Sequence, residues 1–164
     1  MKKFLLVLGS FAMMLMGTAT FTSCGDDDDD DKGGSSNGGK NATITLVENN
    51  KDVKEATIIG DDVLCPFSFM PGMDMMGVYH FDGNKLQNIN MFMDCGSEEN
   101  AKKALESYAQ QMGDTEGAST NGKYLVLAGT AEDFEMEDAE GLDKESLVKY
   151  LNEEMNSGIF ELGN

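Results

Sequence analysis

The stretch VYHFDGNKLQNINMFMD, residues 78–94, decides the fold because it carries the clearest β-hairpin signal in the chain. Two β-prone runs flank DGN at 82–84, residue types that tolerate the positive φ angles of tight hairpin turns. The second run alternates with period two, which is typical of a strand with one buried face. That face would carry Ile89, Met91 and Met93.

Three further strands are expected before this hairpin. ATITLVE (42–48) alternates like a half-buried strand, and KEATII (54–59) could return as its hairpin partner. VLCPFSF (63–69) is β-prone, but Pro66 favours an edge or bulged strand, since proline cannot donate to a ladder. MPGMDMM (70–76) is broken by proline and glycine and is expected to form a loop.

Two helices and one central strand are expected after the hairpin. Ser97 is a good N-cap for an amphipathic helix that ends at Gly113. KYLVLAG (123–129) is apolar on both faces, which suits a central strand. Asp143 would cap a second helix, with Gly158 just beyond its end. The predicted fold is α+β, a small antiparallel sheet with two helices packed on one side.

The N-terminal segment has the order of a secretory signal. Lys2 and Lys3 precede an apolar run, Phe4–Met16, which is followed by small and polar residues. The run has 13 residues, whereas a membrane-spanning helix needs about 20. We therefore expect residues 1–23 to be a signal peptide for export.

The residues around the expected cleavage point, Phe21, Thr22, Ser23 and Cys24, resemble a bacterial lipobox. That resemblance implies that Cys24 is acylated and anchors the chain in a membrane. Phe21 departs from the leucine usual at its position. The alternative is a plain cleavable signal in which Cys24 is incidental.

An acidic run follows Cys24 directly and resembles the surface-export signal of lipoproteins from the Bacteroidota. It consists of Asp26, Asp27, Asp28, Asp29, Asp30 and Asp31. The resemblance implies an outer-membrane protein that faces the cell exterior. Alternatively, the run is only a solvated tether that its like charges keep extended. With either interpretation of the acidic run, residues 24–40 are expected to be the lipidated tether and residues 41–164 a single α+β domain.

Charge excludes one class of partner. The chain has a net charge of -18 and no arginine. Phosphate backbones are bound by clustered cations, so nucleic acid is not an expected partner. Acidity of this kind mainly favours solubility.

Cys65 and Cys95 are an even pair in a chain expected to reach an oxidising compartment. A disulfide between them is the first hypothesis. The alternative is two buried free thiols.

Methionine is the sharpest anomaly in the composition, with 13 in the chain. A cluster with soft ligand atoms surrounds the proposed loop and could bind Cu(I), or it could form an adaptable apolar contact surface for a protein or small ligand. Plain core packing is the third interpretation and the one that explains Met91 and Met93. The candidate cluster is Met70, Met73, Met75, Met76 and His80.

No catalytic constellation is convincing. A nucleophile, base and acid could be drawn only from scattered Ser68, His80 and Asp82, with no motif around the serine. The acidic stretch Glu132–Glu145 fails the EF-hand spacing because Met136 falls where the first carboxylate is required, so a solvated loop is expected, with an incidental weak calcium site as the alternative.

We therefore expect a cell-surface lipoprotein that acts as a non-enzymatic binding or accessory module. It would use no cofactor besides the lipid on Cys24. The alternative is a Cu(I)-handling lipoprotein that uses the methionine cluster.

Overall fold

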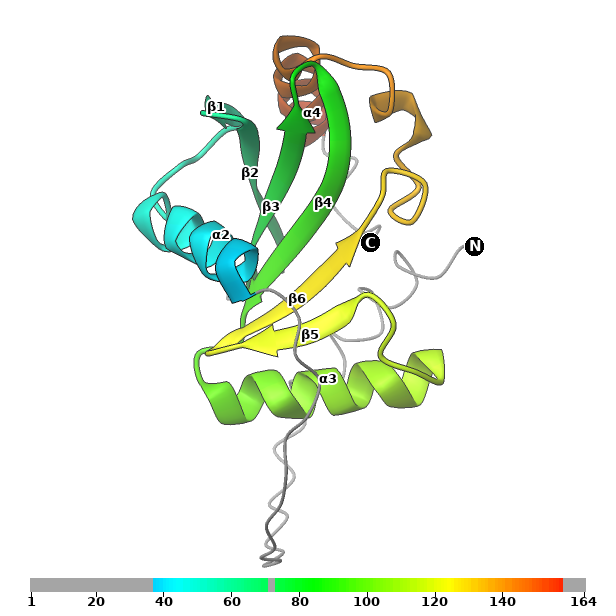
Figure 1. The fold of residues 1–164 in the computed structure, drawn as a ribbon. Coiled ribbons are helices and arrows are strands. Elements are labelled where there is room, and N and C mark those ends of the chain that lie inside the picture. The colour runs from blue at the N-terminus through cyan, green and yellow to red at the C-terminus, as the bar shows by residue number, and fades with distance from the viewer. Residues whose placement is uncertain (1–36, 71–72, 158–164) are drawn as a thin grey trace, which may run out of the picture.

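The computed structural model describes residues 37–70 and 73–157. Its centre is a six-stranded antiparallel sheet in the order β1-β2-β3-β4-β6-β5 (Figure 1). The predicted α+β class is confirmed. The strands are β1 (Thr57–Ile59), β2 (Asp62–Met70), β3 (Met73–Asp82), β4 (Lys85–Asp94), β5 (Ala118–Asn121) and β6 (Tyr124–Gly129).

The predicted hairpin is present as β3 and β4. Asp82 pairs with Lys85, which leaves Gly83 and Asn84 as the two turn residues. Gly83 has a φ of 62°, at the turn position where glycine is favoured in a type II′ hairpin. The two strands are the longest in the sheet, with 10 residues each.

Pro66 lies where the sequence predicted, on a strand that is open on one side and irregular. β1 pairs with β2 only from Asp62 to Leu64, so Pro66 has no partner on the β1 side. The register with β3 also shifts between Ser68 and Met70. The missing N–H of proline therefore costs no ladder bond to β1.

The strand predicted at 42–48 is wrong, because this segment belongs to a helix, α2 (Asn37–Asn49). Ile44 and Val47 are three residues apart, so they lie on the same face of a helix. The alternate residues that would share a face of a strand therefore do not decide between the two structures. Val47 is buried against the sheet with Ile44 beside it, so tertiary packing overrides the β-propensity of the segment. The helix also includes residues 37–40, so the predicted boundary between tether and domain at residue 41 is wrong.

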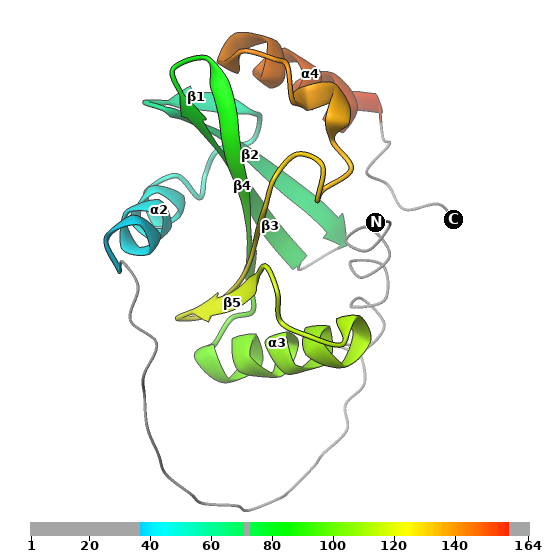
Figure 2. The same cartoon turned by 45° about the vertical axis from the view of Figure 1, so that its right-hand side comes forward.

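The two predicted helices, α3 (Glu98–Met112) and α4 (Lys144–Ser157), are confirmed with their N-caps. The Ser97 hydroxyl accepts from the Asn100 N–H, and the Asp143 carboxylate accepts from the Ser146 N–H at 2.8 Å. Both helices pack on the same face of the sheet. Figure 2 shows α2 on the other side of the sheet from α4.

The strand predicted at 123–129 is confirmed as β6, which lies inside the sheet between β4 and β5. Its first four residues are buried. β5 was not predicted, because its sequence ASTN has little β-propensity. A short 3-10 helix, Glu137–Ala139, precedes α4.

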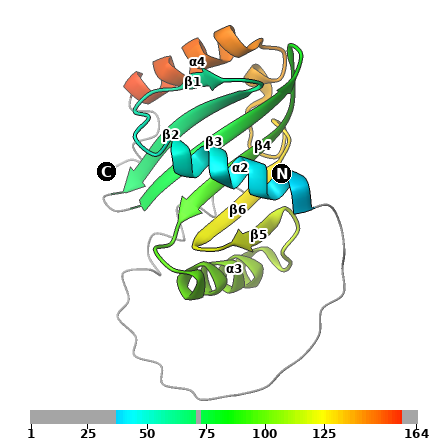
Figure 3. The same ribbon diagram turned by 60° about the vertical axis from the view of Figure 1, so that its left-hand side comes forward.

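The sheet has a core on each face. The larger core joins one face to α3 and α4 through residues such as Tyr79, Ile89 and Leu147. The smaller core lies under α2 and includes Val78 and Phe92. In Figure 3, α2 crosses in front of β2, β3 and β4, while β5 lies beside it.

The expected signal peptide, Cys24 and Asp26–Asp31 lie outside the described residues. Within the described ranges, no helix is long and apolar enough to cross a membrane.

Candidate functional site

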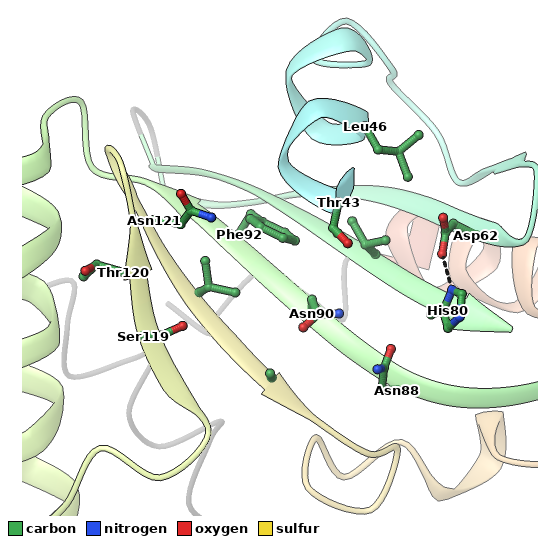
Figure 4. Close-up of a pocket in the computed structure, with 13 residues that line it drawn as sticks. Thr43, Leu46, Asp62, His80, Asn88, Asn90, Phe92, Ser119, Thr120 and Asn121 are labelled. Carbon is green, nitrogen blue, oxygen red and sulfur yellow. Dashed lines mark hydrogen bonds and ion pairs between the residues drawn. The ribbon is translucent and has the colours of Figure 1, made fainter. Parts of the chain in front are cut away.

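A groove of about 600 Å³ opens on the sheet face that α2 covers only in part (Figure 4). Its size falls in the range of small-molecule sites, ~300–1,000 Å³. Strands β2 to β6 form its base, and α2 forms one wall. The lining consists of Thr43, Leu46, Asp62, Val78, His80, Asn88, Asn90, Phe92, Ser119, Thr120, Asn121, Val126 and Ala128.

Neutral polar side chains enter the groove from two strands. Asn88 and Asn90 are two residues apart on β4, so both project from the same face. Ser119 and Asn121 have the same spacing on β5. Figure 4 shows both pairs on the groove side of the sheet.

These four side chains are available to a ligand. Asn88 is exposed, and the other three are half-buried. None of the four side chains has a hydrogen-bond partner among the residues that the structure describes. Each carboxamide offers both donors and acceptors, so the groove presents unused hydrogen-bonding capacity of both kinds.

The floor between the two pairs is apolar. Phe92 and Val126 are adjacent in the β4–β6 register, as are Asn90 and Ala128. Phe92 is 3% exposed, so its ring supports the floor without presenting a face to the groove. Ala128 is exposed and small, which leaves the groove open above β6.

One end of the groove holds the two titratable residues of its lining, Asp62 and His80. His80 Nδ1 lies 2.8 Å from Asp62 Oδ1. Asp62, His80 and Asn88 form one row across β2, β3 and β4. His80 is an exposed residue of β3, and its partner is Asp62.

The α2 wall is held to the sheet by a polar contact. The Tyr124 hydroxyl donates a hydrogen bond to the Glu48 carboxylate, and Lys51 forms an ion pair with the same carboxylate. These bonds from Lys51 and Tyr124 lower the pKa of Glu48. Burial, together with the bond to Glu48, raises the pKa of Tyr124 to about 12.

The prediction of a methionine-rich loop at 70–76 is wrong. Met75 and Met76 belong to β3 and are buried on opposite faces of the sheet, one in each core. His80 is on the same face as Met76, so it cannot share a centre with Met75. The side chains of Met70 and Met73 lie outside the described residues. Core packing, the third interpretation, therefore accounts for the described methionines of the cluster.

The predicted disulfide is also absent, because Cys65 and Cys95 are free thiols. Cys65 pairs with Gly77, and Gly77 pairs with Met91, four residues before Cys95. The Cα atoms of the two cysteines are therefore two strand spacings apart across the sheet and four residues apart along it, which is a distance of roughly 16 Å. A disulfide requires Cα atoms within about 7 Å. Burial raises the pKa of Cys65 to about 12.

The scattered catalytic residues are not brought together. Ser68 pairs with Asp74, which is six residues from His80 on β3, a distance of about 20 Å along a strand. In the acidic stretch, Asp133 accepts from the N–H and hydroxyl of Thr130 and so closes a turn. Within the described ranges, no group of three or more His, Cys, Asp or Glu residues is placed to hold a metal ion.

The sequence reasoning missed the groove itself. The signal was present in the decisive hairpin, because the residues that alternate with Ile89 and Met91 include Asn88 and Asn90. A strand whose second face is polar can still line a site. Ser119 and Asn121 had no such signal, because β5 was not predicted.

In comparisons with known proteins, no family model matches the chain, no curated protein matches it, and no solved structure matches it at a significant level. Its function must therefore be argued from the geometry of the groove.

Proposed function

We propose that this chain is a lipid-anchored cell-surface protein that binds a ligand non-enzymatically in the groove beside α2. One observation carries the binding proposal. Four neutral polar side chains without partners among the described residues line an open groove with an apolar floor. A few polar groups that converge on a largely apolar concavity are typical of ligand sites.

The groove supports binding more than catalysis. Asn88, Asn90, Ser119 and Asn121 are neutral near pH 7 and can orient a ligand, but none of them can act as a general base. The titratable pair lies at one end of the groove, where Asp62 is half-buried and His80 is exposed. No activated nucleophile contacts His80 among the described residues.

A block of the groove tests this proposal. Ala128→Phe places a ring over the floor, while Glu106→Phe places the same ring on the exposed side of α3 as a control. Thermal unfolding is measured with tripeptides, hexapeptides, monosaccharides and hexasaccharides as probes. We expect at least one probe to raise the Tm of the unmodified protein and of Glu106→Phe in a saturable way, and to leave Ala128→Phe unchanged.

Two results would contradict the proposal. Stabilisation that survives Ala128→Phe would place the ligand elsewhere. If no probe stabilised the unmodified protein, a site for these ligand classes would be excluded.

The anchor is proposed from the resemblance of residues 21–24 to a lipobox and from the acidic run behind Cys24. Three acyl chains on Cys24 would hold the protein far more firmly than one chain, whose membrane binding is marginal. Cys24→Ala should release the protein in soluble form, measured by fractionation of membranes. Replacing Asp26–Asp31 with asparagine should protect the domain from protease added to whole cells; continued cleavage would leave the run only a tether.

A further inference from the structure

We infer that the ligand of the groove is an uncharged, extended peptide segment that lies along β6 and bonds through its backbone amides. This inference rests on the proposed function and names the ligand class for the same groove.

The spacing of the polar side chains matches that of an extended peptide. Residues two apart on a strand are ~6.4–6.8 Å apart, and this is also the interval at which an extended peptide presents equivalent backbone groups on one side. Asn88 and Asn90 have this interval on β4, and Ser119 and Asn121 have it on β5. A ligand with the same repeat could therefore bond to both members of a pair at once.

The two pairs are also arranged to flank one chain. β4 and β5 both run antiparallel to β6, so they are parallel to each other and about 9.6 Å apart. The strip between them lies above β6, where Ala128 leaves room for close approach. A peptide on this strip would have Asn90 on one side and Ser119 on the other.

The bonding type favours peptide amides. A carboxamide pairs its C=O with a backbone N–H and its NH₂ with a backbone C=O, so each asparagine can satisfy the N–H and the C=O of one residue of an extended peptide, which point to the same side. A sugar would gain most from the exposed face of a Phe, Tyr or Trp ring, but Phe92, the only such ring in the lining, is 3% exposed. Charge favours an uncharged ligand, because the lining contains no lysine and its two titratable residues, Asp62 and His80, bond to each other. A carboxylate or phosphate would also meet the -18 charge of the chain.

The test uses one peptide and two matched probes. The peptide is acetyl-Gly-Ala-Gly-Ala-Gly-Ala-amide, and the second probe is the same peptide with N-methyl groups on alternate peptide bonds. Maltohexaose is an uncharged non-peptide of similar extent. Titrations of the full chain are followed by calorimetry and by NMR shifts of the asparagine side-chain amides.

We expect saturable binding of the peptide, with shifts at Asn88, Asn90 and Asn121. N-methylation should weaken it about tenfold or more, because several backbone donors are removed. Asn90→Ala should weaken it roughly fivefold or more, whereas Asn84→Ala, which removes the same side chain from the exposed hairpin turn, should leave it unchanged.

The other outcomes separate the two proposals. If maltohexaose binds and the peptide does not, and Ala128→Phe abolishes that binding, the peptide inference is overturned and the groove remains the site. If the peptide binds equally well after N-methylation, backbone recognition is overturned. If neither probe shifts a groove residue, the inference fails, and the wider panel described above decides whether the groove binds anything.

Discussion

The two faces of the sheet are built from the same strands but are used differently. The face toward α3 and α4 is closed, and its strand residues, such as Tyr79 and Ile89, are fully buried. The opposite face is covered by α2 over part of its area, and next to α2 it exposes Asn88 and Ala128. The larger core is therefore on one face, and the groove that we propose as the binding site is on the other.

This division follows from the alternation of β4. Residues 89, 91 and 93 supply the closed face, while residues 88 and 90 supply polar groups to the groove. The groove face can keep polar groups that have no partner among the described residues at little cost, because these groups remain in contact with water. Substitutions on the two faces should separate effects on stability from effects on binding.

The largest expected effect comes from the closed face. Ile89 is fully buried between β4 and the helices. Ile89→Ala should lower the free energy of unfolding by about 2–5 kcal/mol, because it removes buried methyl groups and leaves a cavity. Its neighbour supplies the control, since Asn88→Ala on the exposed side should change stability by about 0.5 kcal/mol or less. Urea denaturation measures both, and equal losses would contradict the division between the faces.

Gly77 gives a second, smaller test of the closed face. A Cβ at this position would lie 2.8 Å from Phe67 Cε2 and 3.0 Å from Tyr79 Cε2. Gly77→Ala should therefore destabilise the protein by about 1–3 kcal/mol through overpacking of the rings. Gly141→Ala is the control, because a Cβ there meets open space. A neutral Gly77→Ala in thermal unfolding would show that the closed face is not tightly packed at this point.

Much of the fold could be predicted from the sequence, where local signals and packing agree. The β3–β4 hairpin, both caps at Ser97 and Asp143, and the interior strand β6 follow from turn chemistry, capping and apolar runs. The strand predicted at 42–48 was wrong because the apolar residues of this segment fit both the period of a strand and that of a helix. Only packing against the sheet decides between the two. The loop predicted at 70–76 was wrong because β3 begins at Met73 and includes Met75 and Met76.

The site was harder to predict for a different reason. It depends on side chains from β4, β5 and α2 that only the strand order brings together. Composition drew attention to Met75 and Cys65, whose side chains are buried. The asparagines of the groove are unremarkable in sequence, since their significance lies in a shared face and in the absence of partners among the described residues.

The smallest expected effect concerns the wall of the groove. The Tyr124 hydroxyl bonds to Glu48 and thereby joins α2 to the sheet, while the Tyr124 ring packs against Phe92. Tyr124→Phe keeps the ring and removes the hydroxyl, so it should cost about 0.5–1.5 kcal/mol near pH 7. Unfolding in urea measures this difference, and hydrogen exchange should show faster opening of Thr43–Val47 in the variant.

The same contact predicts a pH dependence with a definite sign. The pKa of Glu48 is lowered in the folded protein by Lys51 and Tyr124, so its stabilisation is present above the unfolded value of about 4.3 and is lost as pH falls through the folded pKa. The pKa of Tyr124 is raised to about 12, so the hydroxyl stabilises the fold below about pH 10 and loses this effect as pH rises toward 12. The difference in stability between the unmodified protein and Tyr124→Phe should therefore be greatest between about pH 5 and 9 and shrink as pH falls below about 4.3 and through the folded pKa of Glu48. Because the other carboxylates titrate in both proteins, this difference isolates the contact, and a difference that did not shrink with acid would mean that Glu48 does not hold α2 against the sheet.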